Sequence, residues 1–407
     1  MYRVFLRTPY AVRLLGGTLL GRLPNGMATL AILLFTRHHG GGYSLGGLLT
    51  AGYVIAMAAG QPILGRIMDK RGQSVLLPAA VLSGIGFALP VVTGLHPLPV
   101  TFGAILLAGF ATPPLESGLR ALWPAVLPDE GLVSVAYGLD AAAQELLYVT
   151  GPLLVIAAAV VSPEAALLLT AVLGVAGTLV VITAKPSRIW RGEPRVAHWA
   201  GPLRSTGLRV ILGALVCVGV ALGAFNVAAV GYGDGLHSGS AAGLLLAANA
   251  GGAFLGGLVF AARGAGRRPA GTLPWLVAGL AAGYLPLALA PALAPMCVIA
   301  VLAGIFLAPV LGTTFTLVDK LAPRGTVTEA FAWVVTSMAA GAALGSAIAG
   351  RATDLGGTEA AFAVSGAAGL VGLAVIAAGR ALLRPGREAE DLPHGGQPLA
   401  VLEHEGQ

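Results

Sequence analysis

The sequence predicts an all-α integral membrane protein whose twelve transmembrane helices form two six-helix bundles. Three observations predict this fold: an apolar composition, long apolar runs, and basic residues that gather on one side of the predicted membrane. Hydrophobic residues make up 56% of the 407 positions and charged residues only 10%, whereas a soluble domain carries about 25% charged residues. The core of a soluble domain stops growing near about 250–300 residues, so this much apolar surface requires lipid as its solvent.

The apolar runs predict helices and not barrel strands. A helical span needs about 20 mostly apolar residues, and the runs here are that long, unbroken, and rich in leucine and alanine. Backbone groups in lipid must be hydrogen-bonded within the protein, which a helix achieves by itself. We expect spans near residues 12–36, 43–66, 73–94, 98–122, 133–160, 163–184, 207–232, 238–261, 272–291, 294–319, 327–350 and 358–382.

One long polar connector interrupts the interior of the chain, at residues 185–206. It predicts an N-terminal six-helix bundle over residues 1–184 and a C-terminal six-helix bundle over residues 207–383, joined by a cytoplasmic linker. Residues 384–407 are rich in proline, glycine and acidic side chains, a composition typical of a disordered tail. We expect this tail to be cytoplasmic.

The basic residues give the orientation. With twelve spans both termini share one side of the membrane, and all but three of the 24 lysines and arginines fall on or near that side. The exceptions are Arg22, Arg37 and Arg351. Because cytoplasmic loops carry an excess of Lys and Arg, we expect a multi-pass protein of the cell membrane with both termini in the cytoplasm. The net charge of +6 is explained by this asymmetry, so it gives no reason to expect a nucleic-acid partner.

A polar island separates the second and third apolar runs. Its core is Gly65-Arg-Ile-Met-Asp69-Lys70-Arg71-Gly72. This segment resembles the loop between helices two and three of the major facilitator superfamily of transporters, which has two glycines, an aspartate and a following basic residue at these positions. The resemblance implies a conformational-switch loop made of Gly65, Asp69, Lys70, Arg71 and Gly72.

The resemblance also implies individual roles in this loop. Asp69 is expected to engage the N-terminal end of helix eleven across the interface between the two bundles, a helix-dipole contact. Gly65 and Gly72 are expected to allow the tight turn. The sequence departs from the family pattern at Gln73 and Ser74, which replace two basic residues.

The fifth predicted span contains a second motif, Gly151-Pro152. It resembles the antiporter motif of the same superfamily, which is associated with export. The match is partial, because Val155 and Ile156 stand where the motif has further glycines. An ordinary proline kink is the alternative interpretation.

A faint internal repeat relates the two predicted bundles. Tyr137 and Gly151 recur 194 positions later as Phe331 and Gly345, and this offset places the helix after span four onto the helix after span ten. Parallel repeats of this kind are related by a pseudo-two-fold axis along the membrane normal, as in the two halves of the superfamily.

Ionisable residues inside membrane spans are costly and usually face the bundle interior. Those that we consider for the mechanism lie in predicted spans one, four and five: Arg22, Glu116, Arg120, Asp140 and Glu145. We expect Arg22 to pair with either Glu145 or Asp140, and Arg120 to serve the remaining carboxylates. Static ion pairs that join helices are one interpretation. The other is a proton site, with Glu145, Asp140 and Glu116 as candidates, because burial favours a protonated carboxyl and a nearby Arg favours the ionised form.

A central cavity is the expected substrate site. The C-terminal half has no acidic residue deep in a span, so we expect it to supply shape and neutral hydrogen bonds. Core packing is the alternative for each aromatic residue. The candidate cavity residues are Arg22, Asn25, Thr29, Gln144, Tyr148, Asn226, Asn249, Phe306, Thr313 and Trp333.

These features predict a secondary transporter that works by alternating access, with proton-coupled efflux of a small molecule as the leading interpretation. Proton-coupled uptake, movement of a lipid-type substrate, and a non-transporting receptor or scaffold stay open. Enzyme chemistry is not expected: Lys70, Lys185 and Lys320 lie outside any phosphate-binding loop, and the histidines lie in loops, tails or span ends. We expect no cofactor and no metal. The expected partners are the substrate, protons and lipid, and the expected state is a monomer.

Overall fold

The computed structural model describes residues 2–193, 200–237, 239–263 and 269–383. Within these residues the chain is helical and has no strand. The tail predicted over 384–407 lies outside the described residues. The first half contains α1 (Tyr2–Arg7), α2 (Ala11–His38), α3 (Tyr43–Arg71), η1 (Gln73–Val75), α4 (Leu76–Thr93), α5 (Leu98–Phe110), α6 (Leu115–Val126), α7 (Glu130–Ala159), α8 (Pro163–Ile182) and α9 (Lys185–Ile189). The second half contains η2 (Gly201–Arg204), α10 (Thr206–Gly235), α11 (Gly239–Arg263), α12 (Pro269–Tyr284), η3 (Leu285–Leu289), α13 (Leu293–Gly304), α14 (Leu307–Leu321), α15 (Val327–Ala378) and η4 (Arg380–Leu383).

The helices of the described chain are sufficient for twelve membrane spans, as the sequence predicts. Eleven helical stretches of the described chain are long and apolar enough to span a membrane. The last of them, α15, has 52 residues and is broken in its middle, because Gly356 and Gly357 leave the helical conformation. Gly357 has φ +74°, a left-handed value that glycine adopts without steric cost. The predicted spans eleven and twelve therefore meet directly at this glycine pair.

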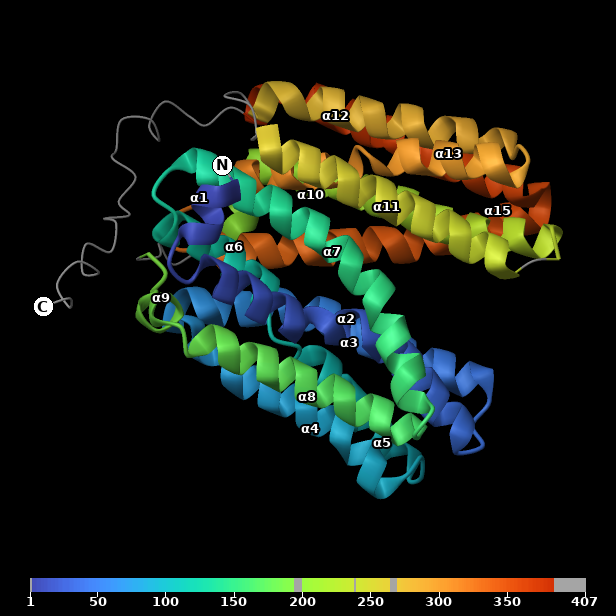
Figure 1. Cartoon of the computed structure of the whole chain (residues 1–407), viewed down its shortest axis with the longest axis horizontal. Coiled ribbons are helices and arrows are strands. Elements are labelled where there is room, and N and C mark those ends of the chain that lie inside the picture. The colour runs from blue at the N-terminus through green and yellow to red at the C-terminus, as the bar shows by residue number, and fades with distance from the viewer. Residues whose placement is uncertain (1, 194–199, 238, 264–268, 384–407) are drawn as a thin grey trace, which may run out of the picture.

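The helices form two groups. In the first half α2 and α4 pack against α8, and α3 packs against α5; in the second half α10 and α12 pack against α15, and α11 packs against α13. Figure 1 shows the two groups close together at the end that carries α1 and α9, and splayed apart toward the opposite end. We call the end with α1 and α9 the closed end and the opposite end the outer end.

Two spans are interrupted at matching places. Span four is broken between Phe110 and Leu115 and contains Pro113 and Pro114 there, which cannot donate helical hydrogen bonds. Span ten is broken after Gly304, and Phe110 and Gly304 are 194 positions apart. This is the offset of the sequence repeat, so both halves break the same helix at the same point.

Small residues set the distance between crossing helices. A Cβ added at Gly151 of α7 would lie 2.7 Å from the carbonyl carbon of Gly26 on α2 and 3.0 Å from its Cα. These are backbone atoms that cannot move aside, so the two helices touch backbone to backbone, the close approach that small residues permit in membranes.

We therefore expect Gly151→Ala to lower the stability of the protein by about 1–3 kcal/mol, the usual cost of overpacking. Thermal unfolding in detergent measures this as a lower melting temperature. Gly16→Ala is the matched control, since an added Cβ there meets no atom within 4 Å. Equal melting temperatures of the two variants would contradict the close contact.

Candidate functional site

Four charged side chains from three helices form a closed ring inside the first half. Arg22 on α2 contacts Asp140 on α7 (Nη1–Oδ1, 2.7 Å) and Glu116 on α6 (Nη2–Oε2, 2.6 Å). Arg120 on α6 contacts the other oxygen of each carboxylate (Nη1–Oε1 of Glu116, 2.7 Å; Nε–Oδ2 of Asp140, 2.7 Å). The signs alternate and the ring is neutral. We call these four residues the charge ring.

The charge ring is deeply buried. Arg120 and Asp140 have no exposed surface, and the side chains of Arg22 and Glu116 are 3% and 13% exposed. Gln144 extends the ring, because its Oε1 accepts hydrogen bonds from Arg22 Nη2 (2.9 Å) and Arg120 Nη2 (3.5 Å). Buried charges are tolerated only when paired and hydrogen-bonded, a condition that this arrangement meets.

Local sequence explains how the ring is assembled. Glu116 and Arg120 are four residues apart on α6, which begins directly after the break in span four. Asp140 and Gln144 are likewise four residues apart on α7. Residues at this spacing share one face of a helix, so each helix offers a pair of polar groups to Arg22.

Of the two partners expected for Arg22, the structure places Asp140 against it and not Glu145. The alternative pair of Arg22 and Glu145 is therefore wrong. Asp140 and Glu145 are five residues apart, which is about 140° around a helix with 3.6 residues per turn. When Asp140 faces α2, Glu145 must face elsewhere. A depth estimate along the helix could not detect this, because it ignores rotation.

Glu145 faces the interface between the two halves. Ala142 on the same side of α7 lies in contact range of Gly257 on α11, since an added Cβ at Gly257 would meet its side chain. Glu145 follows three residues later, partly exposed, and has no hydrogen-bond or ion-pair partner among the described residues. Tyr148, a further turn toward the outer end, is 56% exposed.

The other candidate cavity residues divide into accessible and packed side chains. Asn25 and Thr29 on α2 are partly exposed and Asn226 on α10 is exposed. Asn249 is buried within the second half, where its Nδ2 donates to the carbonyl of Ala300 (3.2 Å) and its Oδ1 accepts from Tyr284 (3.3 Å).

The remaining three candidates come from spans ten and eleven. Phe306 lies against Gly279 on α12, as the core-packing alternative expects. Thr313 is buried, and neither its hydroxyl nor the indole nitrogen of the partly buried Trp333 has a hydrogen-bond partner in the described part of the chain. Of these side chains, Asn249 and Phe306 thus contribute packing within the second half.

The switch loop lies where the two halves meet at the closed end. The Asp69 carboxylate accepts hydrogen bonds from the backbone N–H groups of Thr328 (3.0 Å) and Glu329 (2.9 Å). These groups open α15, which is span eleven, so the acid lies at the positive end of a helix dipole. Arg66 holds the Glu329 side chain (Nη2–Oε1, 2.5 Å) and Lys320 holds Glu130 (Nζ–Oε2, 2.8 Å).

Other residues of the loop serve the turn. Gly72 ends α3 with φ +79°, a left-handed conformation that favours glycine. Gly65 lies against Thr328 and Glu329, where an added Cβ would meet backbone atoms. Lys70 and Arg71 are exposed.

Gln73 has a function that the sequence analysis did not find. Its Nε2 donates to the carbonyl of Gly118 on α6 (2.9 Å), and its Oε1 accepts from Ser187 on α9 (2.6 Å). The amide is buried and ties the connector after span six to the first half. An uncharged amide at a position that is basic in the family pattern was the available signal.

An aromatic contact joins the charge ring to the second half, and this too was missed. The guanidinium carbon of Arg120 lies 3.5 Å from the ring centroid of Phe315 on α14 and 6.0 Å from that of Phe331 on α15. Tyr137 packs on both rings and donates to the Arg120 carbonyl (3.2 Å). Cation–π contacts are favourable when desolvated, so Arg120 stabilises the closed end from inside the first half.

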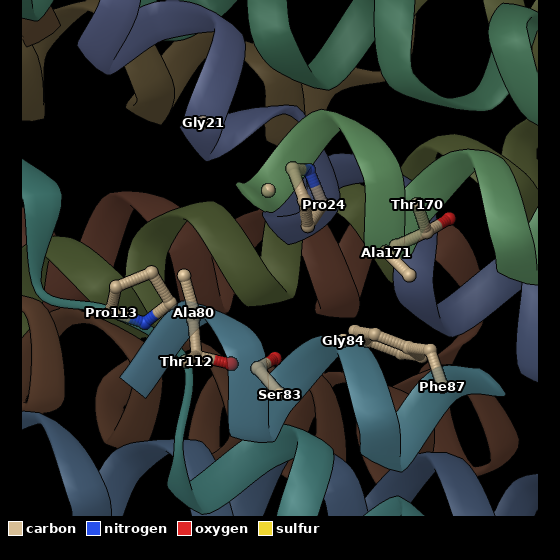
Figure 2. A pocket seen from close by; sticks show the side chains of 11 residues that line it. Gly21, Pro24, Ala80, Ser83, Gly84, Phe87, Thr112, Pro113, Thr170 and Ala171 are labelled. Carbon is tan, nitrogen blue, oxygen red and sulfur yellow. The ribbon is translucent and has the colours of Figure 1, made fainter. Parts of the chain in front are cut away.

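A small pocket beside the break in span four is not part of this site. Figure 2 shows Ser83, Thr112 and Thr170 around it, on α4, the α5–α6 turn and α8. Each of these hydroxyls donates to a backbone carbonyl, of Ala108, Ala108 and Ala166 respectively. None of the three has a donor left to offer a ligand.

Opening the charge ring should destabilise the protein. In Asp140→Asn, Arg22 and Arg120 each lose an anionic partner in a buried site, which typically costs about 3–5 kcal/mol. We expect a clearly lower melting temperature in detergent. Glu164→Gln is the control, because the ion-pair partners of this acid are histidines near the outer end (His39 Nε2–Oε1, 3.4 Å), away from the charge ring. A melting temperature of Asp140→Asn equal to that of Glu164→Gln would contradict the importance of the ring.

Comparison with known proteins agrees with this architecture. The family model described as Major Facilitator Superfamily matches residues 14–226 and 211–404, whereas a search of curated proteins gives no match. Similar solved structures include a bacterial homologue of the iron transporter ferroportin in an outward-facing state (TM-score 0.69, 15% identity, 90% of this chain and 98% of that chain). They also include the human organic anion transporter MFSD10 (0.66, 16%, 89% and 99%) and the E. coli fucose:proton symporter (0.70, 13%, 92% and 98%). At these identities the likeness shows the fold, and the family model shows that this chain belongs to the Major Facilitator Superfamily.

Proposed function

We propose that this protein is a secondary transporter that exports a small molecule in exchange for protons, by alternating access of a site between its two halves. The observation that carries the proposal is a buried charge ring whose Arg120 also contacts the second half. Membership of a transporter superfamily supports transport as such.

The contacts at the closed end suit a reversible seal. They include a few polar interactions, of which Asp69 with the start of α15 and Arg66 with Glu329 are the most buried. Apolar packing of Tyr137 on Phe315 and Phe331 accompanies them, and neither kind of contact is covalent. The similarity to solved structures in an outward-facing state or outward conformation supports an outward-facing form. We propose that the closed end faces the cytoplasm.

The charge ring offers a route from proton binding to this seal. Arg120 holds Glu116 and Asp140 and stacks on Phe315 of the second half. Any change in the charge of the first half that repositions the Arg120 guanidinium also changes its stacking on Phe315. A ligand or proton shifts a conformational equilibrium only by its differential affinity for the two states, and this shared arginine supplies such a difference.

Glu145 is the best candidate for the proton carrier. Asp140 is held by two arginines and Glu116 by the same two, so both carboxylates already have their counter-charges. Glu145 has no such partner among the described residues and is partly exposed. It also lies one turn beyond the contact of Ala142 with Gly257 on α11, so its surroundings change when the halves move.

Export is favoured over uptake by the Gly151-Pro152 motif, whose glycine makes the backbone contact with Gly26. A proton-coupled relative of the same fold exists among the similar structures, the fucose:proton symporter. That protein is a symporter, so the fold itself is compatible with both directions of coupling.

Proton coupling is tested in proteoliposomes that contain a pH-sensitive dye. Protein in the membrane should move protons when a panel of cationic, anionic and neutral organic solutes is added, and the responding solute should accumulate against its gradient when a pH gradient is imposed. Glu145→Gln should abolish the accumulation, because no carboxyl group is left at this position to take up and release the proton.

Glu164→Gln should behave as the unaltered protein in this assay. Unchanged pH-driven accumulation in Glu145→Gln would reject this residue as the carrier. Absence of any solute flux in the unaltered protein would instead favour a receptor or scaffold with this fold.

Alternating access is tested by the distance across the closed end. Spin labels at the exposed positions Ser74 and Arg324, in a background with Cys217 and Cys297 replaced by alanine, report the separation of the halves. Asp69→Asn removes the charge from the start of α15, so we expect the distance distribution to shift toward longer values. A distribution identical to that of the unaltered protein would contradict the role of this contact.

A further inference from the structure

The arginines inside the membrane are already occupied. Arg22 and Arg120 each hold both Glu116 and Asp140, at 2.6–2.7 Å. The remaining nitrogen of Arg22, Nε, is buried. The charge ring is neutral and closed, so it has no cationic group to give to the carboxylate or phosphate of a substrate.

Glu145, in contrast, is a carboxylate without a cationic partner in the described chain. Glu145 lies about 22 Å along α7 from Glu130, at about 1.5 Å per residue, which is near the middle of this 30-residue span. It is partly exposed and has no hydrogen-bond or ion-pair partner in the described chain. The titratable groups that face it are the phenols of Tyr148 on α7 and Tyr284 on α12, which are uncharged. An ionised carboxylate at this depth is costly unless a counter-charge joins it.

The elements around Glu145 bring no such counter-charge. On α2 and α6 the arginines at mid-span, Arg22 and Arg120, belong to the charge ring, and Arg13 and Arg37 lie at the two ends of α2. The described chain has charges on α10, α11 and α14 only at their ends, at Arg209, Asp234, Arg263, Asp319 and Lys320, and on α8 at Glu164 near the outer end. The nearby Tyr148 is 56% exposed, and an aromatic face attracts a cation.

On the basis of the transporter function proposed above, we propose that the site takes a singly charged organic cation, with its charge paired to Glu145 and its apolar body against Tyr148. Substrate and proton then occupy the same carboxylate in turn. An organic anion, the substrate class named for the similar structure MFSD10, would find no available cation here.

Two probe ions of nearly equal size and opposite charge test this inference: tetraphenylphosphonium and tetraphenylborate. Each is added separately to the purified full chain in detergent, and binding is read from the rise in melting temperature and from titration calorimetry, since a ligand that binds the native state stabilises it. We expect the cation to bind and the anion to give no saturable signal. Glu145→Gln should weaken binding of the cation by about tenfold or more, as expected for loss of a charged partner.

Glu164→Gln is the matched control and should bind the cation like the unaltered protein. Acidification should weaken binding of the cation in the unaltered protein and have little effect on the residual binding in Glu145→Gln. Glu145→Asp keeps the negative charge and serves as the second variant if Glu145→Gln does not fold. We expect Glu145→Asp to retain saturable binding of the cation.

Preference for tetraphenylborate, equal binding of the two ions, or no binding of either would overturn the inference, and so would unchanged affinity in Glu145→Gln. Because this is an equilibrium measurement without a membrane gradient, its outcome is independent of the proteoliposome assay. Cation binding without proton movement would leave the substrate class intact and reject the coupling.

Discussion

The neutrality of the charge ring is the constraint on which the rest of this structure depends. Four formal charges lie in a segment surrounded by lipid, where an unpaired charge is very costly. They are tolerated because every carboxylate oxygen of Glu116 and Asp140 meets an arginine nitrogen at 2.6–2.7 Å. The ring thereby fixes the rotation and depth of α2, α6 and α7 relative to one another, and that rotation decides which other side chains face the centre.

Glu145 has its position because of this ring. With Asp140 held against α2, the geometry of α7 turns Glu145 toward the second half, beyond the contact between Ala142 and Gly257. Near mid-membrane, the described first half thus contains two carboxylates with arginine partners, Glu116 and Asp140, and one without, Glu145. Buried ion pairs can specify one arrangement of helices more than they add to stability. Here the arrangement of α2, α6 and α7 leaves the carboxylate of Glu145 to be neutralised by a proton or paired with a ligand.

The two halves share a backbone plan and differ in chemistry. Both interrupt the fourth of their six spans, at Phe110 and at Gly304, with the offset of the sequence repeat. The first half places ionised side chains beyond the break, and the second half places Phe315 and the neutral Thr313 there. The cation–π contact of Arg120 with Phe315 connects the charged groups of the first half to the neutral groups of the second. Movement of the halves must therefore change the environment of the charge ring.

The sequence by itself determined the membrane fold, the twelve spans, their approximate ends and the set of ionisable residues at mid-membrane depth, because hydropathy and segment length follow directly from the need to match lipid. It also indicated the place of Asp69 through the resemblance of its loop to the superfamily's motif. It left the partner of Arg22 open, gave Phe306 a place in the cavity, and did not anticipate Gln73 with Ser187 or Arg120 over Phe315. Only the tertiary structure decided these points, because they depend on the rotation of each helix about its axis, which is set by packing between segments far apart in the chain.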